Sequence, residues 1–152
     1  MFDILHHVPL LENLEEGKLR ALAPLFEPFH AADGATIFEQ GGHTTHLHIL
    51  VAGGVELRYK PYDGPPMTLS RLAPGAVFGW SAAIGNPAYT SSAIACGDCD
   101  TVRIRTSDLH RLYEREPQLA AALLDRLAGD VAPRWKNASQ QVRELLGQKI
   151  AR

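Results

Sequence analysis

Three histidines and two cysteines are the residues whose type and spacing suit metal or redox chemistry. His43, His46 and His48 fall within six residues, and the last two share one face of an expected strand. Neutral imidazoles placed in this way can hold a divalent cation. We favour the alternative, a histidine-rich turn that leads into a strand, because the next carboxylate along the chain, Glu56, comes too late to join them.

Cys96 and Cys99 have the C-x-x-C spacing of metal and redox sites. A structural zinc site normally needs a second pair of ligands, and a thioredoxin-like site needs a βαβ unit and a helix N-terminus. Neither context surrounds this pair, so we interpret it as part of a turn between strands at 91–95 and 101–105. The Gly-x-Ser-x-Gly elbow of many hydrolases is also missing. We therefore predict no catalytic residue, no metal site and no enzymatic activity.

Length and charge limit the classes of protein to which the chain can belong. Its 152 residues, 45% of them hydrophobic, suffice for one globular domain with a core. Fifteen Lys and Arg against seventeen Asp and Glu give a formal net charge of −2, which disfavours direct nucleic acid binding. No segment approaches the ~18 apolar residues of a membrane span, and the N-terminus does not read as a signal peptide. We expect a cytoplasmic protein without membrane contact.

The elements expected in the first two thirds of the chain are a helix followed by many strands. Residues 10–26 place Leu19, Leu22 and Phe26 on one face of an amphipathic helix. From about 36 to 105, short apolar runs alternate with Gly, Pro, Asp and Asn, which is typical of strands and tight turns. Asp63-Gly64 predicts a hairpin turn with positive φ angles.

Helical character returns in the last third. A hydroxyl at Thr106 predicts the cap of a short helix, and Pro117 predicts the first residue of a longer one. We therefore predict a single domain over residues 1–152. It is divided into a helical part at 1–30, a β-roll at 31–105 and C-terminal helices at 106–152.

The last helix carries apolar residues at heptad spacing, which usually pair with a second helix. Gly129 and Pro133 weaken a long straight helix, so packing within one chain, or a kinked helix, is the alternative. We predict a homodimer through this seam. Its residues are Leu124, Ala128, Val131, Trp135, Val142 and Leu145.

The spacing of the glycines in the strand-rich region is similar to that of a known protein family. They occur as Gly41, Gly53, Gly64, Pro74-Gly75 and Phe78-Gly79, with six residues from Gly41 to Leu47 and six more to Gly53. In this register the chain resembles the cyclic-nucleotide-binding domain family, specifically the sensory half of catabolite-activator-type bacterial regulators, over roughly residues 10–146. The resemblance implies a mainly β fold with flanking helices, a double-stranded β-helix or jelly-roll-like β-roll with an N-terminal helix and C-terminal helices.

The resemblance also implies a site for a cyclic nucleotide or another small anionic ligand. Its phosphate is expected at the N-terminus of a short helix after the Phe-Gly pair, where unpaired backbone N–H groups and the helix dipole favour an anion. A facing strand completes the site with hydroxyls. The ligand-binding residues implied are Phe78, Gly79, Trp80, Ser81, Ala82, Ala83, Ala88, Tyr89, Thr90, Ser91 and Ser92.

This sequence departs from the family at two charged positions. Trp80 stands where the family has a Glu that binds the ribose, and Tyr89 (or Ala88) stands where it has an Arg that binds the phosphate. Losing one partner of a buried charge pair costs about 2–5 kcal/mol, or roughly 30-fold to several thousand-fold in affinity. Arg71, Arg103 and Arg105 lie in expected strands and are candidate replacements for the missing cation.

The sequence thus predicts a regulatory, small-molecule-binding module with atypical or lost cyclic nucleotide binding and no DNA-binding domain. In one reading a ligand uses the backbone amides and hydroxyls, with Trp80 or Tyr89 stacked on a flat group. In the other, Trp80 and Tyr89 fill the pocket and the chain is a dimerisation or protein-interaction module. A cupin-like metal enzyme is the weakest alternative, because Gln40 replaces the glycine and Glu56 misses the glutamate position of that pattern.

Overall fold

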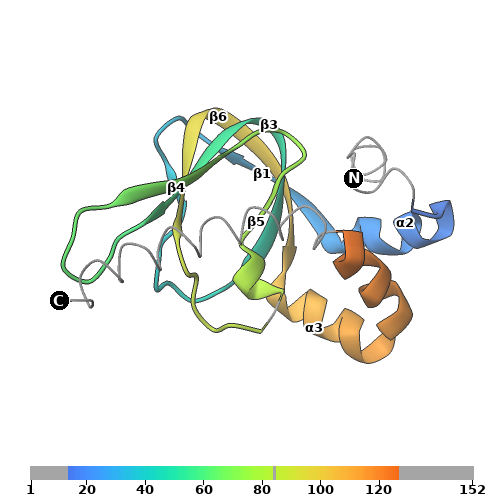
Figure 1. Ribbon diagram of the computed structural model, residues 1–152. Coiled ribbons are helices and arrows are strands. Elements are labelled where there is room, and N and C mark those ends of the chain that lie inside the picture. Colours follow the sequence, from blue (N-terminus) through green and yellow to red (C-terminus); the bar gives the residue numbers. More distant parts are fainter. Residues whose placement is uncertain (1–13, 84, 127–152) are drawn as a thin grey trace.

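The fold is an antiparallel β-roll with helices gathered at one side. The computed structural model describes residues 14–83 and 85–126 (Figure 1). The helical elements of the first part are α2 (Glu16–Leu22) and the 3₁₀ turn η2 (Ala23–Leu25). The strands are β1 (Phe26–Ala31), β2 (Thr36–Phe38), β3 (His46–Tyr59), β4 (Met67–Leu72), β5 (Val77–Phe78) and β6 (Ser92–Arg105). A second 3₁₀ turn, η3 (Trp80–Ala82), follows β5, and α3 (Thr106–Arg115) follows β6.

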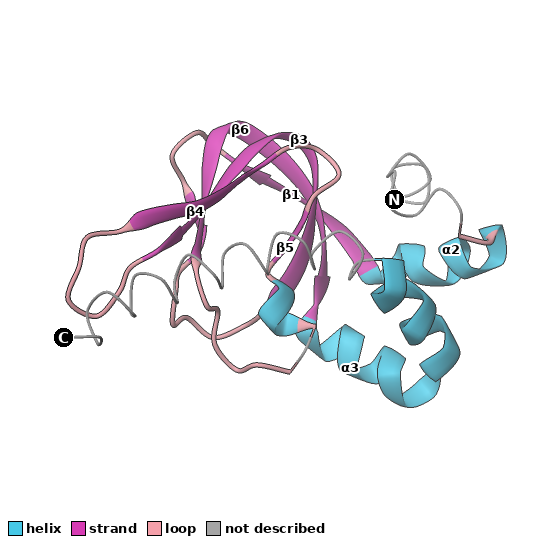
Figure 2. Cartoon of the chain, in the orientation of Figure 1, coloured by secondary structure: helices cyan, strands magenta, loops and turns pink. Residues whose placement is uncertain are grey.

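The six strands form one sheet that curls on itself, as the β-roll prediction requires. The order is β1-β6-β3-β4, with β2 paired to β6 and β5 paired to β3, and every pair is antiparallel. The helices lie together on one side of the roll, while the β3–β4 hairpin extends from the opposite side (Figure 2). The mainly β fold with flanking helices is therefore confirmed.

The two long strands, β3 and β6, bend where Gly53 meets the segment after Cys96. The register between them shifts on both sides of Ala52, and Gly53 has φ of +84°. A Cβ on Gly53 would collide with the Asp98 carbonyl and lie 2.8 Å from the Cys99 Cα. Only glycine fits this close approach, which lets each strand serve both halves of the roll.

Strand alternation divides the apolar side chains into two cores on opposite faces of the sheet. The helix-side core joins the sheet to the helices and includes Leu19, Leu22, Leu47, Ile49, Val102, Ile104, Leu109 and Leu112. The inner core is enclosed by the strands and includes Ala31, Leu50, Val55, Leu72, Phe78, Ala93, Ala95 and Cys99. Leu47 and Ile49 thus point one way along β3, and His46, His48 and Leu50 point the other.

The N-terminal helix is shorter than the sequence predicts. Strand β1 begins at Phe26, inside the segment 1–30 that was expected to be helical. Pro24 explains this, because it has no N–H for a continuing helix, and the chain passes through one 3₁₀ turn into the strand. Residues 1–13 lie outside the described part.

Three smaller predictions also need correction. Thr106 is the first residue of α3 and makes no capping bond; its hydroxyl donates to the Thr44 carbonyl at 3.4 Å. The β3–β4 turn forms at 62–64, but Gly64 is absent from the glycines with positive φ, so the hairpin uses a longer loop. Cys96 and Cys99 lie inside the continuous strand β6, at a bulge where Gly97 has φ of +75°, and not in a turn between two strands.

The C-terminal helices begin as expected. Residues 117–126 are helical, so Pro117 does start a second helix. Of the six seam residues, Leu124 lies in the described part, where it is half-buried and packs against the helix-side core of its own chain. The other five lie outside the described residues, and dimerisation stays a prediction.

Replacing Gly53 with alanine is expected to destabilise the protein more than the same change at Gly34. Both glycines have positive φ, +84° and +81°, so alanine costs about 1–2 kcal/mol at either position. A Cβ at Gly34 meets nothing within 4 Å, whereas at Gly53 it meets the β6 backbone. Urea unfolding of the two variants measures the difference, and equal losses would contradict the close approach of the strands.

Candidate functional site

The candidate ligand segment, residues 78–92, leaves the sheet at Gly79. This residue has φ of +76° and precedes the 3₁₀ turn η3. A Cβ on Gly79 would lie 3.0 Å from the His46 carbonyl oxygen, 3.4 Å from Phe38 Cε2 and 3.5 Å from Tyr89 Cε1. Glycine therefore lets the segment pass between the start of β3 and two aromatic rings.

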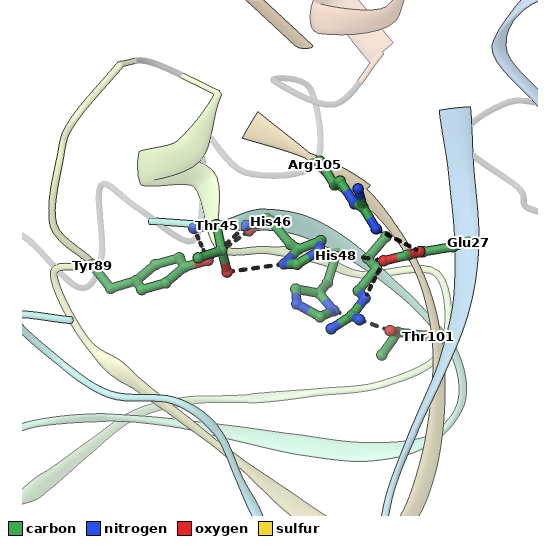
Figure 3. A network of polar contacts seen from close by, with 8 residues as sticks. Glu27, Thr45, His46, His48, Tyr89, Thr101 and Arg105 are labelled. Atoms are coloured by element: carbon green, nitrogen blue, oxygen red, sulfur yellow. Dashed lines mark hydrogen bonds and ion pairs between the residues drawn. The ribbon is translucent and has the colours of Figure 1, made fainter. Parts of the chain in front are cut away.

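Tyr89 is buried, and its hydroxyl is fully engaged with the start of β3 (Figure 3). The oxygen accepts hydrogen bonds from the backbone N–H groups of Thr45 at 3.1 Å and His46 at 3.0 Å. The O–H donates to the His46 carbonyl at 2.8 Å. Its ring stacks face to face on Phe38, with centroids 3.8 Å apart and an 11° interplanar angle. The side chain in the expected arginine position is thus a fixed structural element.

Backbone bonds hold the same loop against residues 41–44. Tyr89 N–H donates to the Gly42 carbonyl at 3.0 Å, and Gly41 N–H donates to the Tyr89 carbonyl at 2.8 Å. Thr44 N–H donates to the Pro87 carbonyl at 3.1 Å. The loop that should face a ligand is therefore positioned by segments more than 40 residues earlier in the chain.

The Trp80 side chain packs away from the stacked rings of Phe38 and Tyr89. It is half-buried and lies against the helix-side core, on the face of the sheet opposite the inner core. Its neighbour Ser81 is buried, and the carbonyl of Ala83 accepts a hydrogen bond from the Tyr113 hydroxyl of α3 at 2.7 Å. The turn η3 is thus anchored to the helices, and its first side chain does not stack with Phe38 and Tyr89.

An aromatic cluster surrounds His48 on the inner face of the sheet. The His48 ring stacks on Phe78 at 4.9 Å and meets Phe29 edge to face at 5.6 Å. Its Nδ1 lies 3.0 Å from the Thr101 hydroxyl. Burial, aided by the nearby charges of His46 and Arg103, lowers the pKa of His48 to about 3. His48 is therefore a neutral core residue at ordinary pH.

The hydroxyl groups that were expected to bind a ligand do not all lie together, and not all of them are available to a ligand. Ser92 Oγ accepts a hydrogen bond from the Gln40 backbone N–H at 2.9 Å, which ties the start of β6 to the end of β2. Ser91 is half-buried and Thr90 is exposed, while Ser81 is buried behind η3. The hydroxyls at 81 and 90–92 thus differ in burial, and that of Ser92 already has a backbone partner.

The three candidate arginines lie in two different places. Arg71 is on the outer face of the sheet, 83% exposed, with its Nε 3.8 Å from Glu56 Oε1. Arg103 donates from Nε to Glu27 Oε1 at 2.9 Å, and Arg105 lies 3.9 Å from Glu27 Oε2 (Figure 3). None of these contacts is with residues 78–92.

Glu27 also forms an ion pair with His46. This group of charged residues was not predicted from the sequence, because residues 1–30, which include Glu27, were expected to be helical. His46 Nε2 is 3.3 Å from Glu27 Oε1. Burial would raise the pKa of Glu27, but Arg103, Arg105 and His46 outweigh it and lower that pKa. Burial lowers the pKa of His46, and Arg103 lowers it further against the opposing pull of Glu27.

The histidines and cysteines do not converge on a metal site in the described part of the chain. His46 and His48 share a strand face, as expected, but their ring centroids are 6.1 Å apart and each ring has its own partner. Cys99 is buried and Cys96 is exposed. Within residues 14–83 and 85–126, no group of three His, Cys, Asp or Glu side chains is placed to hold a metal, and no helix could span a bilayer.

Comparison with known proteins identifies relatives over most of the chain. The model of the cyclic nucleotide-binding domain matches residues 28–116. A CRP-like cAMP-activated global transcriptional regulator of Mycobacterium tuberculosis is 25% identical over 128 residues, which cover 84% of this chain and 57% of the relative. This chain thus spans little more than half of that regulator's length.

Solved structures agree with the sequence match. A crystal structure from Geobacter metallireducens superimposes with a TM-score of 0.76 at 29% identity, covering 88% of this chain and 96% of that one. The Thermus thermophilus catabolite activator protein gives a TM-score of 0.72 at 26% identity, covering 90% of this chain and 62% of that one.

Tyr89→Phe is expected to lower the free energy of unfolding by about 1–3 kcal/mol, because it leaves the backbone N–H groups of Thr45 and His46 without the hydroxyl oxygen that accepts their hydrogen bonds. Tyr62→Phe is the matched control, since Tyr62 is fully exposed in the β3–β4 loop. Chemical denaturation compares the two variants. If Tyr89→Phe lowers the free energy of unfolding no more than Tyr62→Phe does, the Tyr89 hydroxyl does not stabilise the fold.

Acid is expected to destabilise the protein through His48. The unfolded state takes up a proton near pH 6.5, whereas the folded state resists until about pH 3, so stability falls as pH drops below 6.5. Between pH 7.5 and pH 5 this amounts to about 2 kcal/mol, at 1.36 kcal/mol per pH unit. His48→Gln should flatten the stability profile over this range, while His43→Gln, at an exposed position, should leave the profile as it is in the wild type; equal profiles for the two variants would contradict the assignment.

Proposed function

The chain belongs to the cyclic nucleotide-binding domain family, and we propose that it is a non-enzymatic regulatory module. In this proposal its small-ligand site does not bind a cyclic nucleotide through the family's usual arginine contact to the phosphate and glutamate contact to the ribose. The ligand acts on residues 78–83 and 88–92, at the join between the roll and the helices. Regulation of a partner, or of further domains in a longer protein, is part of this proposal.

The state of Tyr89 is the observation that carries the proposal. A phosphate-binding cation at this position would have to reach out of the loop, whereas Tyr89 is buried, stacked on Phe38 and bonded to the backbone of Thr45 and His46. Arg–phosphate pairs are among the stronger polar contacts in proteins, and nothing charged takes their place in the loop. This segment therefore lacks the positively charged side chain that would bind a phosphate.

The position of Trp80 supports the same conclusion. The family's acidic residue at this place binds the ribose, but here the side chain packs against the helix-side core. Ligand-dependent regulation remains feasible because η3 is tied to α3 by the bond from the Tyr113 hydroxyl to the Ala83 carbonyl, 2.7 Å long. A ligand that shifts residues 79–83 would act directly on the helices.

Isothermal titration calorimetry with cyclic AMP and cyclic GMP tests whether the chain has lost the usual binding of cyclic nucleotides. We expect no micromolar binding to the wild-type chain, and saturable micromolar binding would refute the proposal. Thr90→Arg adds a cation beside Tyr89 at an exposed position, without removing the buried ring. It should raise the affinity for cyclic AMP at least about 10-fold, corresponding to 1.4 kcal/mol, while the control Thr90→Gln should not.

A further inference from the structure

His46 is the residue at which the main-chain contacts of Tyr89 meet a group of charged side chains (Figure 3). Its backbone N–H donates to the Tyr89 hydroxyl at 3.0 Å, and its carbonyl accepts from the same hydroxyl at 2.8 Å. Its imidazole, in turn, lies beside the Glu27 carboxylate. One residue therefore holds the loop of residues 85–91, here called the Tyr89 loop, and also carries a group that can take up a proton.

The His46 imidazole is largely enclosed, since only 16% of the side chain is exposed. Nδ1 lies 2.9 Å from the hydroxyl of Thr45. Nε2 is buried and makes no hydrogen bond with any residue that the structure describes. It is 3.3 Å from Glu27 Oε1, which is within ion-pair distance. Buried polar atoms without a hydrogen bond are rare in native structures, so this nitrogen needs an explanation.

The charges that face this imidazole come from the two neighbouring strands. Glu27 lies on β1, and Arg103 and Arg105 lie on β6. Arg103 Nε already donates at 2.9 Å to Glu27 Oε1, the same oxygen that lies near the imidazole. Arg105 is 3.9 Å from Oε2. On β3 itself the neighbouring titratable group is His48, which stays neutral down to about pH 3. One carboxylate thus faces two permanent cations before His46 gains a charge.

Protonation of His46 opposes this arrangement. Burial is the main cause that lowers the pKa of His46 below its ordinary value of 6.5, and the charge of Arg103 lowers it further. Glu27 acts in the opposite direction without restoring the ordinary value. The closed arrangement therefore resists the proton. As pH falls below 6.5, acid favours any conformation in which the imidazole reaches water.

The start of β3 is the part of this arrangement that can open locally. His46 is the first residue of the strand, and strand ends open at a lower free energy than strand interiors. The N–H groups of Thr45 and His46 are both bonded to the Tyr89 hydroxyl. Because the Thr45 hydroxyl ties the ring to the adjacent main chain, we expect the ring and the strand end to move together.

We propose that His46 is an acid-sensitive switch: when it takes up a proton, the first residues of β3 open and release the Tyr89 loop. In the neutral state the Tyr89 hydroxyl joins the loop to the strand. In the protonated state the imidazole moves away from Arg103 into water, and the main-chain bonds to Tyr89 are lost. The effector is a proton, so the switch acts without a ligand and goes beyond the proposed function.

Hydrogen exchange detected by NMR on the full chain between pH 7.5 and pH 5 tests the switch. After correction for the pH dependence of the chemical exchange step, it reports the opening equilibrium at each amide. The opening equilibrium of the Thr45, His46 and Tyr89 amides should rise together in acid, several-fold and at most about 30-fold, because pH 5 is 1.5 units below 6.5. Leu50, whose N–H donates to the Ala76 carbonyl at 2.8 Å, should exchange more slowly than all three, which shows that the opening is local.

Two pairs of variants assign the response to His46. His46→Gln should abolish the rise in acid, while His48→Gln, at the second buried histidine of the same strand face, should retain it. Arg103→Gln should weaken the rise, because the charge of Arg103 is one cause of the lowered pKa of His46. Its control is Arg71→Gln, at a position that is 83% exposed, which should leave the response unchanged.

Three results would each overturn the inference. The first is an equal acid response in the wild type and in His46→Gln, or equal responses in Arg103→Gln and Arg71→Gln should His46→Gln fail to fold. The second is opening of Thr45 and His46 with Tyr89 still protected, because the loop is then not released. The third is titration of the imidazole in NMR spectra with unchanged exchange, because the ring then turns to water by itself. None of these results depends on cyclic nucleotide binding, so the inference and the proposed function fail separately.

Discussion

The hydroxyl of Tyr89 is the contact on which the arrangement of the candidate site depends. It bridges both backbone groups of His46 and the N–H of Thr45, and so joins the loop that contains Tyr89 to the first residues of the central strand β3. The stacked Phe38 ring fixes the plane of the tyrosine, and Gly79 provides the room for both rings. A side chain that reaches outward from this position would leave the start of β3 without its hydrogen-bond partner.

Alternation along the strands then decides which chemistry faces the interior. On β3 and β4 it sends Glu56, Arg58 and Arg71 outward and turns Leu57 and Ser70 inward. Buried charge without a partner is costly, and the buried Glu56 finds its partners in Arg58 and Arg71 on the outer face, so the inner face around Leu57 and Ser70 stays neutral. The electrostatic character of the site thus follows from the register of the sheet as much as from the residues of the loop.

Much of the fold was accessible from the sequence, because the positions that require glycine are specific. Gly53 and Gly79 have left-handed φ angles and close neighbours, and both were part of the pattern that indicated the β-roll. The errors came from local signals that tertiary contacts override. Gly64 suggested a tight turn that the longer loop does not use, and the spacing of Cys96 and Cys99 suggested a break in a strand that continues through a bulge.

By itself, the sequence indicated the family and the β-roll, and it predicted the loss of two charges at positions where the family resemblance places ligand contacts. Only the tertiary structure decided where the replacing side chains point: Tyr89 toward the start of β3 and Trp80 toward the helices. The physical reason is that the loop between them has no hydrophobic period. Its conformation is set by hydrogen bonds to residues 41–46 and by ring stacking on Phe38, contacts that lie more than 40 residues away in sequence.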